Sequence, residues 1–284
     1  MNTLKTGILL SALTVLLVFV GQLIGGSNGA MTAFVFALVI NLASYWFSDK
    51  LVLAMYRAKP LSEAEAPQVY RAVRAIVAHE HLPMPRLYRL PTETPNAFAT
   101  GRSPKHAAVA VTDGILRLMD EEELKGVLAH ELSHVKNRDT LVMSIAAAVA
   151  GAISMLAHWA RWGLMWGGRG DHRRNNNAAV QLAALLLIAI LAPLAAMLIQ
   201  LAISRTREYG ADETGARLTG NPNGLANALE KLDAAVRARP MLGANPATAH
   251  LFIVNPLKMD AVAKLFSTHP PIAERVKRLR TMRL

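Results

Sequence analysis

Two long apolar runs at the start of the chain constrain its fold more than any other feature. The first extends from Leu4 to Ile24 with Lys5 as its only charged residue, and the second extends from Met31 to Phe47. A membrane-spanning helix needs about 20 consecutive apolar residues, so we expect the two runs to cross a bilayer as a hairpin. A cleaved signal peptide would have a shorter apolar core, and no second run would follow it at once.

The charges that flank this hairpin indicate its orientation. The connecting residues 25–30 carry no charge, whereas the segment after the second run contains Lys50, Arg57 and Lys59. Cytoplasmic loops of membrane proteins are enriched in Lys and Arg. We therefore expect the hairpin tip outside the cytoplasm and both hairpin ends inside it.

The composition of the chain supports a membrane protein. Its formal net charge of +11 is typical of nucleic-acid-binding proteins and also of proteins anchored against anionic lipids. The 52% of hydrophobic residues, with only 6% aromatic residues, and the lack of a nucleic-acid-binding motif favour a lipid bilayer over a nucleic acid as partner. Cysteine is absent, so any metal ion must be held by His, Asp or Glu.

Two further apolar runs follow a more polar segment. Residues 61–139 have amphipathic patterns, several prolines and ordinary charge density, which is typical of a soluble segment. The later runs, Thr140 to Trp162 and Ala178 to Ile203, bring the expected transmembrane helices to four. Three arginines between residues 169 and 174 lie at the tip of this second hairpin, against the charge rule. The second hairpin therefore either crosses the membrane with an external tip or dips into it without crossing.

A five-residue motif carries the clearest chemical signal. His130, Glu131 and His134 form H-E-x-x-H in a predicted helix that begins with the capping-box residues Asp120 and Glu123. Residues four apart lie on one helix face, so both imidazoles can bind one ion, with Glu131 about 100 degrees round beside a water in the fourth position. Neutral imidazole suits zinc, and Glu131 can take the proton of that water as it attacks a peptide carbonyl. The alternative is an amphipathic helix with two surface histidines.

A second predicted helix supplies carboxylates. Glu208 and Asp212 are four residues apart in RTREYGADETGARL, which leads out of the last apolar run. This helix can direct Glu208 to the zinc as third ligand, while Asp212 accepts a hydrogen bond from a ligand histidine and sets its tautomer. The alternative is a solvated face that pairs Glu208 with Arg205 and Asp212 with Arg217. Two matched helices favour the metal site.

These features together resemble the HtpX-type membrane zinc metallopeptidases, gluzincins related to the CAAX prenyl proteases. The resemblance covers nearly the whole chain and is carried by the two leading apolar runs, NAFATG from Asn96, VAVTDGIL from Val109, HELSHVKNRD from His130, SRTREYGAD from Ser204 and STHPP from Ser267. It implies that His130, His134 and Glu208 bind one zinc ion per chain. It also implies that Glu131 is the general base and that Asp212 supports a ligand histidine.

The resemblance also bears on a late histidine and two arginines. His269 precedes two prolines, and from sequence alone a capping or packing role is the more common one. The resemblance instead implies a hydrogen-bond donor to the oxyanion of the tetrahedral intermediate. Arg205 or Arg207 could share that role or anchor the last span at the lipid headgroups.

Two strand-like segments beside the motif helix are candidate walls of a substrate cleft. Their main-chain groups could pair with an extended peptide as an added strand, or they could form a plain structural hairpin. The resemblance assigns the cleft walls to Asn96, Ala97, Phe98 and Ala99 and to Val109, Ala110 and Val111.

We therefore predict a mainly α membrane protein with four transmembrane helices and a cytoplasmic zincin-like metallopeptidase domain that contains a small β-sheet. The predicted parts are an N-terminal transmembrane hairpin (1–49), a first domain segment with the HExxH helix (50–139), a second transmembrane hairpin (140–204), and a second domain segment with the ExxxD helix and the HPP sequence (205–284).

The resemblance implies an endopeptidase of the bacterial cytoplasmic (inner) membrane that faces the cytoplasm and cleaves misfolded or damaged membrane proteins in quality control. CAAX-type processing uses the same site, but those relatives usually have more membrane helices. A non-catalytic scaffold would need a structural zinc site, which normally has four protein ligands. A transporter would favour acidic residues within its spans, and these runs contain none. The sequence leaves the oligomeric state open.

Overall fold

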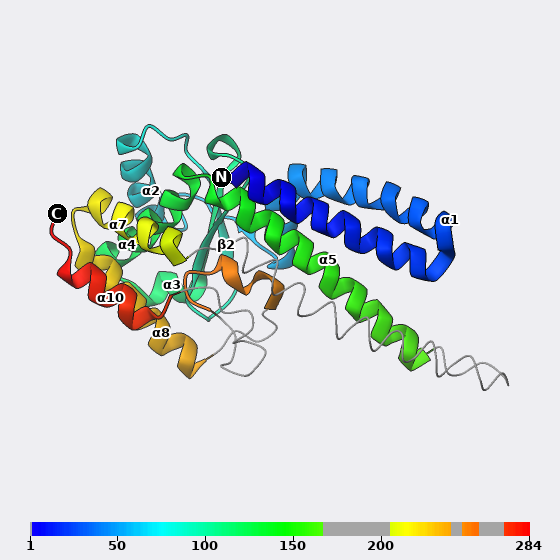
Figure 1. The fold of residues 1–284 in the computed structure, drawn as a ribbon. Helices are drawn as coiled ribbons and strands as arrows, with labels where there is room; N and C mark the ends of the chain where they lie inside the picture. Colours follow the sequence, from blue (N-terminus) through cyan, green and yellow to red (C-terminus); the bar gives the residue numbers. More distant parts are fainter. Residues whose placement is uncertain (1, 167–204, 240–245, 256–269) are drawn as a thin grey trace.

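A computed structural model of the chain describes residues 2–166, 205–239, 246–255 and 270–284 (Figure 1). The described elements are α1 (Asn2–Met55), β1 (Lys59–Pro60), α2 (Pro67–His79), β2 (Arg86–Leu90), β3 (Ala97–Thr100), η1 (Pro104–His106), β4 (Ala108–Thr112), α3 (Asp113–Leu118), α4 (Glu121–Lys136), α5 (Asp139–Trp166), α7 (Arg205–Thr219), α8 (Pro222–Ala238), η2 (Pro246–Leu251) and α10 (Ile272–Thr281). The predicted fourth apolar run, the tip before it and His269 lie outside the described residues.

α1 is the predicted N-terminal hairpin, because its helix breaks at two glycines. Gly25 and Gly26 have non-helical dihedral angles, and Gly26 has a φ of 57°, which a residue with a side chain rarely adopts. The two arms, Leu4–Gln22 and Gly25–Met55, are both long and apolar enough to cross a membrane. Within the hairpin, Asn41 Nδ2 donates to Thr14 Oγ1 at 2.8 Å and so joins the arms.

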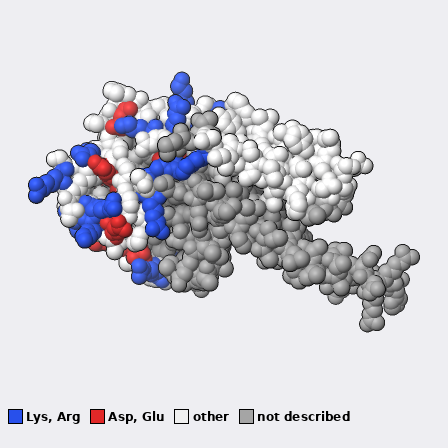
Figure 2. Space-filling model, viewed as in Figure 1, with Lys and Arg blue, Asp and Glu red and all other residues white. Residues whose placement is uncertain are grey.

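The third predicted run is helical and packs along this hairpin. α5 runs beside α1 (Figure 1), and Val142, Ile145 and Val149 pack with Leu9 and Leu13 in one buried cluster. Figure 2 shows Lys, Arg, Asp and Glu gathered over the opposite end of the molecule, whereas the visible face of the hairpin carries almost none. Within the described part of the chain, only the two arms of α1 are long and apolar enough to span a membrane. A total of four spans therefore stays a prediction.

The domain at the polar end contains a four-stranded mixed sheet in the order β1-β2-β4-β3. β2 and β4 are parallel, whereas β1 pairs with β2, and β3 with β4, in antiparallel fashion. β4 therefore has a partner strand on each side, and β3 forms an edge of the sheet. This order decides which strand can offer main-chain groups to another peptide.

α4 lies at the centre of this domain. It packs against β3, α2, α7 and α8, and 12 of its 16 residues are buried. The predicted capping box is confirmed, since Asp120 accepts from the Glu123 amide and Glu123 accepts from the Asp120 amide. An apolar helix face of this kind is stable only when other elements cover it. The burial of α4 on several sides therefore places the H-E-x-x-H motif inside the domain.

Candidate metal centre

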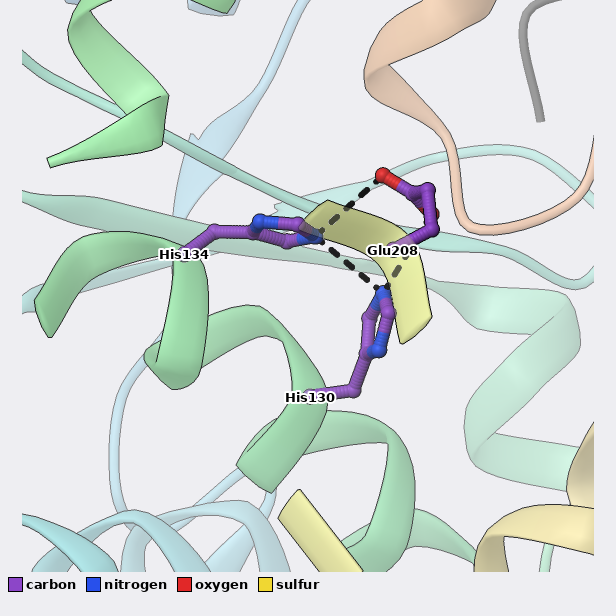
Figure 3. Close-up of side chains that lie close together, drawn as sticks. All are labelled: His130, His134 and Glu208. Atoms are coloured by element: carbon purple, nitrogen blue, oxygen red, sulfur yellow. Dashed lines mark hydrogen bonds and ion pairs between the residues drawn. The ribbon is translucent and has the colours of Figure 1, made fainter. Parts of the chain in front are cut away.

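The two motif histidines converge from one face of α4. Figure 3 shows the imidazoles of His130 and His134 directed to a common point, with their Nε2 atoms 3.3 Å apart. Their rings meet edge to face, with centroids 4.8 Å apart, and both side chains are buried. The four-residue spacing on a helix produces this convergence.

Glu208 reaches the same point from α7. Its Oε1 lies 3.5 Å from His134 Nε2, and its Oε2 lies 3.9 Å from His130 Nε2 (Figure 3). The two helices approach closely because α7 carries Gly215 where it meets α4. A Cβ atom there would lie 2.9 Å from the backbone nitrogen of His130. The glycine thus allows a distance between helix axes that lets Glu208 complete a three-residue cluster.

The geometry of this cluster fits a tetrahedral zinc ion. Ligand atoms bound to zinc at 2.0–2.1 Å in a tetrahedron lie about 3.3 Å from one another. Two of the three separations, 3.3 and 3.5 Å, are close to this value, and the third, between His130 Nε2 and the Glu208 carboxylate, is longer, at 3.9 Å to Oε2. The three ligand atoms all lie within 4.8 Å of one another. Two imidazoles and one carboxylate are also a donor set that zinc prefers, and they leave a fourth position open.

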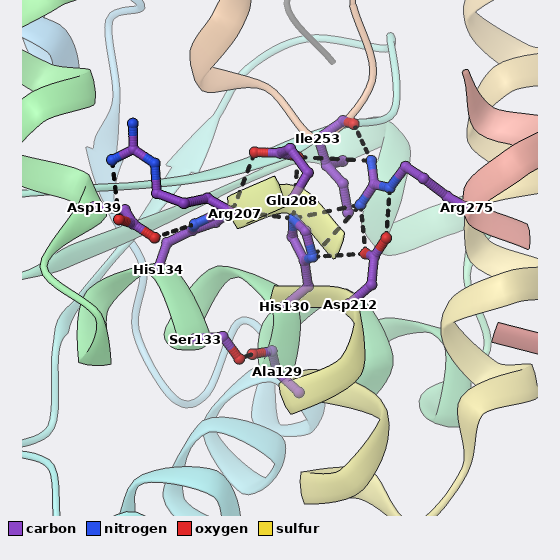
Figure 4. Close-up of polar contacts among 10 residues, drawn as sticks. All are labelled: Ala129, His130, Ser133, His134, Asp139, Arg207, Glu208, Asp212, Ile253 and Arg275. Atoms are coloured by element: carbon purple, nitrogen blue, oxygen red, sulfur yellow. Dashed lines mark hydrogen bonds and ion pairs between the residues drawn. The ribbon is translucent and has the colours of Figure 1, made fainter. Parts of the chain in front are cut away.

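Each histidine is oriented by a carboxylate behind it. Asp212 Oδ1 lies 3.0 Å from His130 Nδ1, and Asp139 Oδ2 lies 3.2 Å from His134 Nδ1 (Figure 4). When the protonated Nδ1 donates a hydrogen bond to a carboxylate, Nε2 carries no proton and its lone pair is free to bind a metal ion. The structure therefore sets the same tautomer in both histidines.

Each of these aspartates is held in turn by an arginine. Arg275 is fully buried and donates through Nε and Nη2 to the two oxygens of Asp212, at 2.8 and 2.7 Å. Arg207 Nη1 donates to Asp139 Oδ1 at 3.1 Å (Figure 4). Burial alone would raise the pKa of Asp212, but the charge of Arg275 and its hydrogen bonds lower that pKa to about 2. Asp212 therefore stays ionised at neutral pH.

The buried carboxylates give the centre a negative potential. Burial lowers the pKa of His130 to about 4, so this ring is neutral, as a metal ligand must be. Burial also lowers the pKa of His134, but its hydrogen bond with Asp139 and the charges of Glu208 and Glu131 outweigh it and raise the value to about 9. The site therefore favours a positive charge at its centre.

Glu131 belongs to α4 and contacts the β3 strand that packs against this helix. Its side chain is buried, and burial together with the charge of Glu208 raises its pKa to about 8, although a hydrogen bond from the Ala99 backbone lowers it. A carboxyl group with a pKa near neutrality can both accept and return a proton at physiological pH. Its position and its pKa suit a general base.

The other predicted site residues that the structure describes lie in different surroundings. Arg207 contacts Asp139, whereas Arg205 is exposed at the start of α7. Val109, Ala110 and Val111 form the middle of β4, whose main-chain groups are already paired with β2 and β3, so this strand cannot accept a peptide as an added strand. Their assignment to the walls of a substrate cleft stays a prediction. β3, in contrast, lies at the edge of the sheet and has a partner strand on one side only.

Two residues of the site were not foreseen from the sequence. Asp139 follows His134 by five residues at the start of the next helix, and its place in the HELSHVKNRD segment was the available signal. Arg275 is one of four basic residues in α10 and carried no distinguishing signal. Its burial against Asp212 depends on the packing of α10 beside α7 and α8.

Comparisons with known proteins agree with this geometry. Residues 63–283 match the model described as peptidase family M48. The chain is 59% identical over 278 residues to a protease HtpX homolog from Syntrophobacter fumaroxidans, with 98% of each chain covered. It is 56% identical over 277 residues to a protease HtpX homolog from Thermococcus sibiricus, with 98% of this chain and 94% of the other covered.

One solved structure shares the fold at low sequence identity. The crystal structure of Ste24p from S. mikatae matches with a TM-score of 0.50 and 18% identity, over 96% of this chain. This chain spans 62% of the length of that protein. The similarity therefore concerns the fold alone.

Proposed function

The chain belongs to peptidase family M48 and is a membrane metallopeptidase, and from this premise we propose that its metal is zinc, held by His130, His134 and Glu208. The arrangement of the three ligand atoms supports the proposal, since two of their separations, 3.3 and 3.5 Å, are close to those of a tetrahedral zinc site. Three protein ligands leave a position for chemistry, as catalytic zinc sites do and closed structural sites do not.

Glu131 has the central role in the proposed reaction. When bound, the zinc ion lowers the pKa of a water molecule and polarises the peptide carbonyl. Glu131 removes a proton from the attacking water and returns it to the nitrogen of the leaving amine. Its buried position beside β3 places it between the metal ligands and an edge strand. Asp212 and Asp139 keep both ligand imidazoles in the orientation that this geometry needs.

We propose that the substrate adds a strand at the β3 edge. Asn96 O accepts from the Thr112 amide on the β4 side, so by antiparallel alternation the main-chain groups of Ala97 and Ala99 face the outer edge. Ala97 O already accepts from the Ile253 amide, and the Ala99 amide donates to Glu131, so the Ala99 carbonyl is the outward group that we propose as acceptor for a peptide. The Asn96 side chain donates to Val254 O and is fully buried, so its part is to hold the strand in place.

The remaining site assignments rest on the family resemblance. His269 would donate to the oxyanion of the intermediate. Arg207 would act through Asp139, because its guanidinium is already bonded to that carboxylate. Arg205 lies exposed at the end of the last predicted span and suits the headgroup region.

We further propose that the protein is a four-span protein of the bacterial inner membrane with its active centre in the cytoplasm. The charge pattern around the first hairpin supports this orientation. Segments 50–139 and 205–284 would form the peptidase domain together, and misfolded membrane proteins would be its substrates. CAAX-type processing is the second candidate, and the shared fold with Ste24p supports it at the level of architecture alone.

One experiment separates metal binding from proteolysis. In detergent, wild-type protein should contain about one zinc per chain and cleave casein in a chelator-sensitive manner. Glu131→Gln should keep its zinc and lose cleavage, because the ligands remain while the base is removed. Glu208→Ala should lose zinc. Cleavage by Glu131→Gln would refute the mechanism, and an unchanged zinc content in Glu208→Ala would remove Glu208 from the ligand set.

A further inference from the structure

A basic cavity lies where the membrane hairpin meets the peptidase domain. It has a volume of about 390 Å³ and lies between the end of α1, β2 and the η1 turn. Its cationic lining consists of Lys50, Arg86, Arg102 and Lys105, and Asp49 is the carboxylate in the lining. Four cations against one carboxylate leave an excess of positive charge. We call this space the junction cavity.

Most of this charge has no acidic partner. Asp49 forms an ion pair with Arg86. Within the part of the chain that the structure describes, no carboxylate lies within ion-pair distance of Lys50, Arg102 or Lys105. A protein rarely gathers unpaired cations around a hollow without an anion to bind there, because like charges repel one another.

One of these cationic groups, the Arg102 guanidinium, is also held in place. Arg102 lies over the ring of Trp46, 4.5 Å from its centroid, and donates to Trp46 O at 3.2 Å. A second nitrogen of Arg102 lies 2.9 Å from His106 Nε2, and His106 Nδ1 lies 3.0 Å from Ser103 Oγ. Because Arg102 can only donate, Nε2 is the acceptor and Nδ1 carries the proton. The η1 turn and α1 thus orient the guanidinium before any ligand arrives.

The cavity lies at the depth expected for lipid headgroups. Trp46 and Phe47 line it from the polar end of the second membrane arm and are 48% and 49% exposed. Exposed aromatic residues followed by a lysine are typical of a membrane interface. A site for a free anion would not need exposed aromatic residues beside it, so this position favours a lipid headgroup as the ligand.

An apolar stripe leads from the membrane arm into the cavity. Leu38, Leu42 and Trp46 are spaced four residues apart on α1, so they lie on one face of the helix. All three side chains are about half exposed or more. An acyl chain could lie along this stripe while its headgroup occupies the cavity.

We propose that the junction cavity binds the phosphate group of an anionic phospholipid of the surrounding bilayer. Arg102 contributes a preoriented guanidinium, Lys50 and Lys105 contribute ammonium groups, and the Leu38–Trp46 stripe contacts the acyl chain. The site ties the η1 turn of the peptidase domain to the lipid surface. It does not depend on the peptidase chemistry.

The test compares lipid binding by the full-length protein and matched variants. Delipidated protein in detergent is mixed with phosphatidylglycerol or phosphatidylcholine, and bound lipid is counted by native mass spectrometry. Wild type should prefer phosphatidylglycerol. Each basic residue near an anionic lipid contributes about fivefold in affinity, so Lys50→Gln with Lys105→Gln should weaken phosphatidylglycerol binding about 25-fold. Among the residues that the structure describes, no carboxylate pairs with either lysine, so the double variant should fold.

Two controls distinguish the site from general charge attraction and from a free phosphate site. Lys277→Gln with Arg283→Gln removes the same charge from exposed positions in and after α10 and should leave lipid binding unchanged. A large excess of inorganic phosphate should fail to displace phosphatidylglycerol, because the acyl chain adds affinity. Equal binding of the two lipids, equal loss in both double variants, or displacement by phosphate would each overturn the proposal.

Discussion

The substitution Asp212→Asn tests whether the tautomer of a ligand histidine controls metal affinity. Asp212 accepts three hydrogen bonds, two from Arg275 at 2.7 and 2.8 Å and one from His130 Nδ1 at 3.0 Å. An asparagine of the same size has one acceptor oxygen, and its NH2 group would face one of these donors. The variant therefore removes the charge and turns one attraction into a repulsion.

The structure sets the size of the expected effect. Loss of a partner that orients a ligand histidine weakens metal binding about 10- to 100-fold. The fully buried Arg275 would lose its hydrogen-bonded carboxylate and keep only the more distant Glu208, 3.9 Å away, so the free energy of unfolding should fall by about 3–5 kcal/mol. Zinc affinity is measured by competition with a fluorescent chelator. Stability is measured from tryptophan fluorescence on heating, since the chain has four tryptophans and no cysteine for thiol dyes.

The neighbouring residue provides a matched control. Glu213 lies on the same helix and pairs with Arg217, but its side chain is 60% exposed. Glu213→Gln removes the same charge and should cost at most about 1 kcal/mol, with no change in zinc affinity. The reasoning fails if Asp212→Asn binds zinc within twofold of wild type, or if both variants weaken zinc binding equally.

Two further substitutions test helix packing. Gly215→Ala places a Cβ atom 2.9 Å from the His130 nitrogen, so it should separate α7 from α4, cost about 1–3 kcal/mol and lower zinc content. Gly210→Ala, with no atom within 4 Å of its Cβ, should keep full zinc content, and an equal loss in both would contradict the packing argument. Asn41→Leu removes the hydrogen bonds from Nδ2 to Thr14 Oγ1 and Leu10 O between the membrane arms, which should lower stability in detergent by about 0.6 kcal/mol for each bond and leave zinc affinity unchanged. A loss of zinc in this variant would show that the hairpin and the metal centre are coupled.

Local patterns made several parts of this protein predictable. The four-residue spacing of His130 and His134 depends only on helix geometry, and both side chains do point to one centre. The capping box at Asp120 and Glu123 is equally local and was confirmed.

Non-local pairing limited the prediction elsewhere. Both strand-like segments looked equally suited to bind a peptide, but strand order buries β4 between two partners and leaves β3 at an edge. Sequence patterns report which residues favour a strand, whereas the neighbours of that strand depend on the whole sheet. Arg275 was missed for the same reason, because its contact with His130 spans 145 residues.

The sequence by itself determined the donor types, their spacing along each helix and the apolar lengths that suit a membrane, because these depend on covalent order and backbone periodicity. Only the tertiary structure decided that Gly215 lets α7 approach α4. It also decided that Arg275 neutralises Asp212 and that four cations surround a cavity at the end of α1. These arrangements bring together residues far apart in the chain. Their stability comes from burying apolar surface and pairing charges between elements, and no local pattern encodes which elements will meet.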